Sequence, residues 1–205
     1  MALKETNCLI VGVGGQGTVL AARVLGAAAM LAGFDVRGSE TIGMAQRGGS
    51  VTSHVRMGKN MAANHLEISG PASPLIPSGR ADAILAFEPG EALRTIDFLK
   101  PGGTFIVCDR PIVPAVRGDY DGAAAARWLQ EHTCARVVSG EDIIKNCGVR
   151  SVNVALIGAA AARGAFPFGF DEIEKALIER LDAKFLAVNL AALHYGSDIM
   201  TGKQP

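Results

Sequence analysis

The stretch Cys8–Gly17, CLIVGVGGQG, constrains the fold of this chain more than any other part of its sequence. It begins with an apolar run, Cys8–Val11, of the kind that forms a strand buried on both faces of a parallel sheet. A glycine turn follows, and a helical pattern starts at Thr18. Glycines let such a turn tighten and let its N–H groups approach an anion or a partner. The candidate residues of this turn are Gly12, Gly14, Gly15, Gln16 and Gly17.

Two interpretations of the glycine turn stay open on these residues alone. A G-x-G-x-x-G match between a strand and a helix is the context expected of a dinucleotide site. Many α/β domains, however, use the same turn only to pack the first helix against the first strand. A dinucleotide site also needs an acidic residue at the end of the second strand, to bind the ribose hydroxyls. Glu40 is the candidate, and no hydride-transfer constellation follows it.

The remaining pattern alternates between strands and helices. Strands are expected at 34–40, 51–57, 81–87, 104–108 and 135–139, and helices at 18–32, 89–99, 121–131, 139–146, 152–162, from 170 and at 184–195. The second strand is expected to complete a β-α-β unit with a parallel neighbour. Pro101–Gly103 is expected to form the turn before the strand at 104–108, and Asp121 and Asp171 are expected to cap their helices. We therefore predict a three-layer, Rossmann-like α/β/α fold with a mostly parallel sheet and C-terminal helices. At 205 residues, the chain suits a single domain over residues 1–205.

Composition narrows the classes of function. Twenty basic and twenty acidic residues give a net charge of zero, and no basic run with interleaved aromatics predicts nucleic-acid binding. No apolar run approaches the roughly 20 residues of a membrane helix, and no signal peptide is evident. We therefore expect a cytoplasmic protein that does not bind a membrane. The neutral, Ala- and Gly-rich composition instead indicates a surface covered in part by another subunit.

Metal and hydrolytic chemistry find no support in the sequence. The four cysteines are too far apart for a zinc pair or an iron–sulfur run, and Cys8 and Cys108 are expected in the core. His54 lies in a predicted strand, where a half-buried, hydrogen-bonded histidine is expected. The serines lack a nucleophile elbow, and there is no P-loop. We therefore assign no catalytic and no metal-ligating residue.

A second loop, Gly43–Ser50, is as unusual as the first. It combines glycines with hydrogen-bonding side chains on a short backbone, and the fork of its arginine suits phosphate or carboxylate. Because it follows the second strand, it is expected at the same sheet edge as the glycine turn, where open α/β sheets bind ligands. An ordinary surface loop with a salt-bridged arginine is the alternative. The candidate residues are Gln46, Arg47, Gly48, Gly49 and Ser50.

Taken together, the motifs Gly12–Gly17, Ser39–Glu40 and Gly43–Arg56 resemble those of the gamma-type subunits of the 2-oxoacid:ferredoxin oxidoreductases. Within that family the sequence is most similar to the beta subunit of indolepyruvate ferredoxin oxidoreductase. The resemblance extends over nearly the whole chain and includes the Asn153 helix and the C-terminal helices.

The resemblance implies a non-cofactor-bearing subunit of a larger enzyme. That enzyme oxidatively decarboxylates a 2-oxoacid, indolepyruvate or another aryl-pyruvate, forms an acyl-coenzyme A and passes electrons to ferredoxin. Thiamine diphosphate, Mg and [4Fe-4S] clusters are expected in a large partner subunit, with CoA as co-substrate and no cofactor bound by this chain alone. The two glycine loops would face that partner or CoA.

Two other classes of function remain as alternatives. The first is a free-standing Rossmann-type protein that binds NAD or FAD through the glycine turn and Glu40. The second is a non-enzymatic scaffold derived from such a complex.

Overall fold

The computed structural model describes residues 5–43, 48–59, 73–113 and 120–202 of the chain. The strands are β1 (Glu5–Val13), β2 (Phe34–Ile42), β3 (Ser50–Lys59), β4 (Ala81–Ala86), β5 (Leu99–Cys108) and β6 (Arg136–Val138). The α-helices are α1 (Thr18–Leu31), α2 (Pro89–Thr95), α3 (Gly122–His132), α4 (Gly140–Cys147), α5 (Val152–Ala162), α6 (Phe170–Arg180) and α7 (Ala183–Thr201). Two short 3₁₀ turns, η1 (Ile96–Phe98) and η2 (Val149–Ser151), complete the described elements.

The strands form one six-stranded sheet in the order β2-β3-β1-β4-β5-β6. The pairs β1–β4, β4–β5 and β5–β6 are parallel, whereas β3 is antiparallel to both of its neighbours. The predicted mostly parallel α/β sheet is thus confirmed.

The position of β3 corrects one expectation from the sequence. The predicted pairing of the strand at 34–40 with a parallel neighbour is wrong, because the strand that pairs with β2 among the described residues is the antiparallel β3. β2 still runs in the same direction as β1, but β3 lies between them. The crossover from β1 through α1 to β2 therefore passes over one strand position. β3, the next strand in the chain, runs back antiparallel to β2 and occupies that position.

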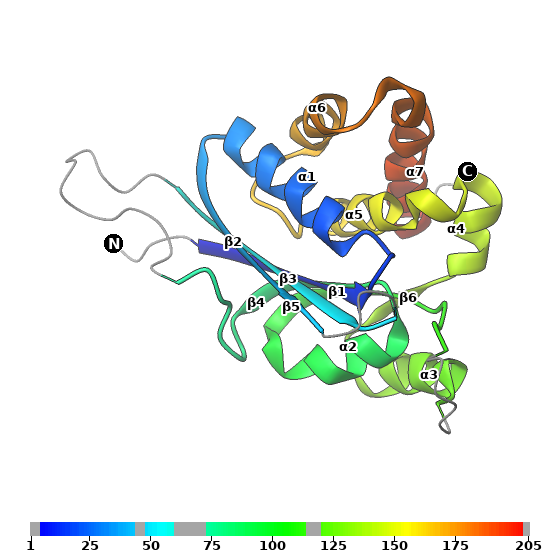
Figure 1. Cartoon of the computed structure of the whole chain (residues 1–205). Helices are drawn as coiled ribbons and strands as arrows, with labels where there is room; N and C mark the ends of the chain where they lie inside the picture. The colour runs from blue at the N-terminus through cyan, green and yellow to red at the C-terminus, as the bar shows by residue number, and fades with distance from the viewer. Residues whose placement is uncertain (1–4, 44–47, 60–72, 114–119, 203–205) are drawn as a thin grey trace.

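Helices cover both faces of the sheet and make the three predicted layers (Figure 1). On one face α1, α4, α5, α6 and α7 enclose the larger apolar cluster, which includes Ile10, Leu25 and Leu156. On the other face α2 and α3 enclose a smaller cluster around Leu9 and Phe105. β1 and β4 supply side chains to both clusters, which explains their continuous apolar sequences.

Two local details differ from the sequence-based expectations. Pro101–Gly103, expected as a turn before a strand, lies inside β5, where the pairing register with β4 shifts and Gly102 adopts a φ of 75°. Asp171 is not the N-cap of α6, because the helix already begins after Gly169, whose N–H donates to the Glu172 carboxylate at 3.0 Å. By contrast, Asp121 caps α3 as predicted, accepting from the N–H of Ala124.

Candidate functional site at the glycine edge of the sheet

The glycine turn after β1 and the end of the second glycine loop lie against each other. The N–H of Gly14 donates to the carbonyl oxygen of Gly49 at 2.8 Å, and Val13 is opposite Ser50 in the β1–β3 register. The N–H of Gly43 donates to the carbonyl oxygen of Ser50 at 2.9 Å, which closes the second loop at its base. Antiparallel pairing of β3 with β1 produces this contact, because β3 starts beside the C-terminal end of β1.

Gln16 holds the glycine turn in place through both halves of its amide. Its Oε1 accepts from the N–H of Val13 at 2.7 Å, and its Nε2 donates to the carbonyl oxygen of Phe87 at 2.8 Å. Gly12 leaves the necessary room, since a Cβ there would lie 2.8 Å from Gln16 Oε1. The side chain of Gln16 therefore ties the end of β1 to the end of β4.

Gly17 is required by both its conformation and its neighbour. It precedes α1 with a φ of 82° and a ψ of 28°, a left-handed conformation that favours glycine. A Cβ on Gly17 would lie 2.4 Å from Nδ2 of Asn153, which donates to the carbonyl oxygen of Gly17 at 3.3 Å. Asn153, 3% exposed at the start of α5, thus packs directly on the turn although 136 residues separate the two in sequence.

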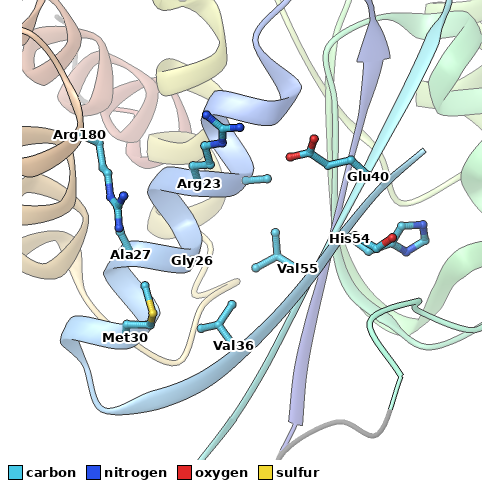
Figure 2. A pocket seen from close by; sticks show the side chains of 12 residues that line it. Arg23, Gly26, Ala27, Met30, Val36, Glu40, His54, Val55 and Arg180 are labelled. Atoms are coloured by element: carbon cyan, nitrogen blue, oxygen red, sulfur yellow. The ribbon is translucent and has the colours of Figure 1, made fainter. Parts of the chain in front are cut away.

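The other residues predicted from the sequence are placed as follows. Gln46 and Arg47 lie outside the described residues. Gly48 and Ser50 border the glycine turn from the β3 side, and Gly15 is exposed at its tip. Glu40 lies on β2, where its side chain extends over the face that carries α1 (Figure 2). Two strand spacings, about 10 Å, separate β2 from β1.

A cavity of about 440 Å³ opens beside the turn at the C-terminal ends of β1, β4 and β5. Two arginines that the sequence analysis did not single out, Arg110 and Arg150, reach its wall, and neither makes an ion pair with any residue that the structure describes. α1 begins here with no acidic residue in its first turn and no side-chain cap, so its dipole adds positive potential. The lining is Gly14, Gly15, Gln16, Gly17, Leu20, Phe87, Cys108, Arg110, Ile112, Val149, Arg150, Val152 and Asn153.

Two buried glutamates, Glu88 and Glu91, connect the end of the second loop to α2 through hydrogen bonds. Ser50 Oγ donates to Oε2 of Glu91 at 2.6 Å, and Glu88 caps α2 by accepting from the N–H of Glu91 at 2.9 Å. The Tyr120 hydroxyl donates to the other oxygen of Glu88 and accepts from the N–H of Gly90. Burial and the hydrogen bond to Glu88 raise the pKa of Tyr120, so the phenol stays protonated and remains a donor.

His54, Cys8 and Cys108 have the structural roles that the sequence predicts. His54 Nδ1 accepts from the N–H of Ile76 at 3.1 Å, and burial together with the nearby Arg56 lowers the pKa of His54. Cys8 and Cys108 are buried free thiols, and burial raises the pKa of Cys108 to about 11. These thiols stay protonated near neutral pH and pack as core side chains.

Neither a metal cluster nor a membrane span is found in the part of the chain that the structure describes. No group of three or more His, Cys, Asp or Glu side chains there could hold a metal ion. Among the same residues, no helix has both the length and the apolarity that a membrane crossing requires.

Solved structures show which known fold this chain shares. The gamma subunit of a keto/oxoacid ferredoxin oxidoreductase from Geobacter sulfurreducens superimposes with a TM-score of 0.66 at 21% identity, over 96% of this chain and 99% of that one. A 2-oxoglutarate:ferredoxin oxidoreductase from Magnetococcus marinus gives a TM-score of 0.70 at 21% identity, over 97% of this chain and 31% of that longer one. The fold is thus that of the gamma subunits of oxoacid oxidoreductases.

Sequence comparison then defines the family. Residues 7–199 match the family described as pyruvate ferredoxin/flavodoxin oxidoreductase. The indolepyruvate oxidoreductase subunit IorB of Archaeoglobus fulgidus is 38% identical over 93% of this chain and 92% of its own length. The IorB of Pyrococcus horikoshii is 37% identical over 95% of each chain. The chain belongs to the pyruvate ferredoxin/flavodoxin oxidoreductase family, as its paired glycine motifs predicted.

Proposed function

We propose that this chain is the small subunit of an indolepyruvate-type 2-oxoacid:ferredoxin oxidoreductase, with an aryl 2-oxoacid as substrate. The enzyme converts the 2-oxoacid and CoA to acyl-CoA and CO₂ and passes the electrons to ferredoxin. The observation that carries the proposal is the 33–38% identity to indolepyruvate oxidoreductase subunits over at least 92% of their length. Thiamine diphosphate, Mg and [4Fe-4S] clusters belong to a large partner subunit, and this chain works in complex with it.

The role proposed for this subunit is to present the glycine edge of its sheet to the partner and to CoA. The cavity beside the turn supports this role, because two arginines that form no ion pair within the described part of the chain, together with the start of α1, give it a positive character. Arginine and a helix N-terminus are the groups that proteins use to bind phosphate. Arg110 and Arg150 are therefore proposed to contact the CoA phosphates, together with the Gln46–Arg47 segment of the second loop.

The strand order weighs against the free-standing dinucleotide-binding alternative. In a dinucleotide site the acidic residue for the ribose lies on the strand next to the glycine turn. Here β3 occupies that position, and Glu40 lies one strand further out on β2. A thermal-shift measurement with NAD, FAD and CoA tests the point directly: stabilisation by NAD or FAD alone would favour the alternative.

Reconstitution tests the proposed activity. The chain is co-expressed with the large thiamine-type subunit from the same organism, and ferredoxin reduction is followed with indolepyruvate, phenylpyruvate, pyruvate and 2-oxoglutarate, each with and without CoA. We expect a stable complex with CoA-dependent turnover that is fastest on the aryl substrates. Failure of the two chains to associate, or equal turnover by the large subunit alone, would refute the proposal.

The arginine variants test the CoA assignment in the same assay. Removing one charge-assisted hydrogen bond to phosphate should raise the KM for CoA by about tenfold or more in Arg110→Ala and Arg150→Ala. Arg127→Ala, an exposed arginine on α3 at the other face of the sheet, serves as the matched control and should leave the KM unchanged. If all three variants behave alike, the two arginines do not contact CoA.

A further inference from the structure

A second cavity, of about 480 Å³, adjoins the one beside the glycine turn. It is formed by η2, the end of α4 and the first half of α7, together with Leu20 of α1, in the helical layer on one face of the sheet (Figure 1). The two cavities share Leu20, Val149 and Arg150 in their walls. The apolar side chains that line the second cavity are Leu20, Cys147, Val149, Leu181, Phe185 and Val188.

Apolar side chains at the mouth of this cavity are exposed to solvent. Val149 is 55% exposed and Val188 is 40% exposed, although large apolar side chains usually lie inside. Phe185, Val188 and Asn189 lie on one side of α7, because residues three and four positions apart share a helix face. A ligand with an apolar body would therefore be stabilised here, since binding removes these surfaces from water.

Asn189 brings an unsatisfied acceptor into this apolar wall. The residue is 4% exposed, and its Nδ2 donates to the carbonyl oxygen of Phe185 at 2.8 Å. Its Oδ1 is buried and has no hydrogen-bond partner among the described residues. The orientation of the amide is fixed, since the opposite one would place two acceptor oxygens against each other. A buried acceptor without a donor is costly and rare in native proteins, so this oxygen indicates where the donor of a ligand fits.

Arg150 adds a positive charge to the same wall. It is exposed and forms no ion pair with a residue that the structure describes, and its guanidinium suits a carboxylate. We propose that this cavity binds a small aromatic acid whose ring carries an N–H group, as an indole does. The ring packs against Phe185, its N–H donates to Asn189 Oδ1, and the carboxylate pairs with Arg150.

Other ligands fit this wall less well. A hydroxyl or an amide would bring an acceptor oxygen of its own into the apolar wall, whereas a ring N–H is a donor only. A purely apolar ligand would leave the oxygen of Asn189 unpaired. The aryl 2-oxoacid proposed as substrate belongs to the same class of acid, so a role of this cavity in holding that substrate rests on the proposed function. The binding itself does not, and it is measured on this chain without the large subunit.

Matched ligands test the hydrogen bond to Asn189. Isothermal titration calorimetry on the full chain compares indole-3-acetate with benzothiophene-3-acetate, in which a sulfur replaces the ring N–H at nearly the same shape. We expect a single site for indole-3-acetate. The dissociation constant of benzothiophene-3-acetate should be about tenfold higher, because Asn189 Oδ1 then stays unpaired. 3-Methylindole, which has the ring without the carboxylate, should also bind more weakly.

Two variants separate the contributions of the amide and the guanidinium. In Asn189→Leu the preference for indole over benzothiophene should disappear, while the thermal midpoint stays the same or rises because an unpaired acceptor is removed. Arg150→Ala should weaken the binding of both acids by about tenfold and leave that of 3-methylindole unchanged. Gln130→Leu, at an exposed position on α3 across the sheet, is the matched control and should bind all three ligands as the wild type does.

The outcomes are distinct. Equal binding of the two acids to the wild type, or an indole preference that persists in Asn189→Leu, overturns the proposal. Absence of binding of all three ligands also overturns it. In that case, weaker association of Asn189→Leu with the large subunit would show that a side chain of that subunit occupies the cavity, and weaker binding of CoA would assign the cavity to CoA. Because neither turnover nor the large subunit enters the calorimetry, failure of this proposal leaves the proposed activity standing, and failure of the activity leaves this binding site standing.

Discussion

At the scale of single residues, Gln16 shows how a side chain in a glycine-rich motif serves the fold. Both hydrogen bonds of its amide go to backbone groups, the N–H of Val13 and the carbonyl oxygen of Phe87. These groups terminate two neighbouring strands, where no further ladder partner is available. Gln16 thereby holds the turn against the ends of both strands.

Replacing Gln16 should accordingly cost stability. Gln16→Ala leaves the N–H of Val13 and the carbonyl oxygen of Phe87 without partners, so we expect a loss of about 2 kcal/mol in the free energy of unfolding. Urea denaturation of the isolated chain measures it. Gln130→Ala, an exposed glutamine on α3, should change the midpoint little. Equal midpoints for Gln16→Ala and the wild type would show that the clamp contributes nothing.

His54 makes the stability depend on pH in a defined direction. Burial, and secondarily Arg56, lower its pKa in the folded chain, while the unfolded value stays near 6.5. The unfolded chain therefore binds more protons, so the contribution of His54 to stability is present above about pH 6.5 and is lost as the pH falls below it. The wild type should lose more stability between pH 8 and pH 5 than His54→Gln. Parallel pH profiles for the two proteins would contradict this, and His132→Gln should follow the wild type.

At the scale of elements, the packing of α5 against α7 depends on two glycines. A Cβ on Gly158 of α5 would lie 1.9 Å from the carbonyl oxygen of Leu193, and one on Gly196 of α7 would lie 1.8 Å from that of Ala155. The two helices thus approach backbone to backbone, and each glycine lies against the other helix. This contact sets how closely α7 packs on α5.

Alanine at these glycines should separate the two helices. We expect Gly158→Ala and Gly196→Ala to destabilise the chain by about 3 kcal/mol or more, since the backbone must move to remove the overlap. Gly26→Ala in α1 is the matched control: its Cβ would meet only Val36 Cγ1 at 3.6 Å, so the better helix propensity should stabilise the chain by up to about 1 kcal/mol. Thermal or urea unfolding gives both signs. A neutral Gly158→Ala would mean that α5 and α7 do not depend on this glycine for their packing.

The sequence predicts the elements of this fold better than their arrangement. The α/β alternation and the aspartate cap of α3 follow from local patterns, because each depends on residues close together in the chain. Pairing does not: the alternation in Val51–Met57 predicts a strand but carries no information on its direction. The position of β3 between β1 and β2 depends on contacts across the whole sheet, which a local pattern does not encode.

At the scale of the whole molecule, the candidate site is assembled from segments that are distant in sequence. The sequence predicts that the two glycine loops lie at the same edge of the sheet, because both follow strands that run in the same direction. The contact between Gly14 and Gly49 itself comes from the antiparallel pairing of β3 with β1. Arg110 and Arg150 could not be found from the sequence, since they follow β5 or precede α5 and carry no motif of their own, and Asn153 was noted only through the family resemblance of its helix. The only local signal was that Arg110 comes two residues after a buried strand, at the sheet edge where the turn also lies.

This arrangement predicts where assembly with the large subunit should protect the backbone. The glycine turn has an exposed tip at Gly15, and the loop at Gly148–Arg150 is exposed on the other side of the cavity. If this edge faces the partner, amide hydrogen exchange at 14–17 and 148–151 should slow at least about tenfold in the complex, because binding removes the solvated open states. The outer face of α3, across the sheet, should keep its exchange rate and serves as the internal control (Figure 1). Protection of α3 with unchanged exchange at the turn would place the partner on the opposite layer of the molecule and would refute the role proposed for the glycine edge.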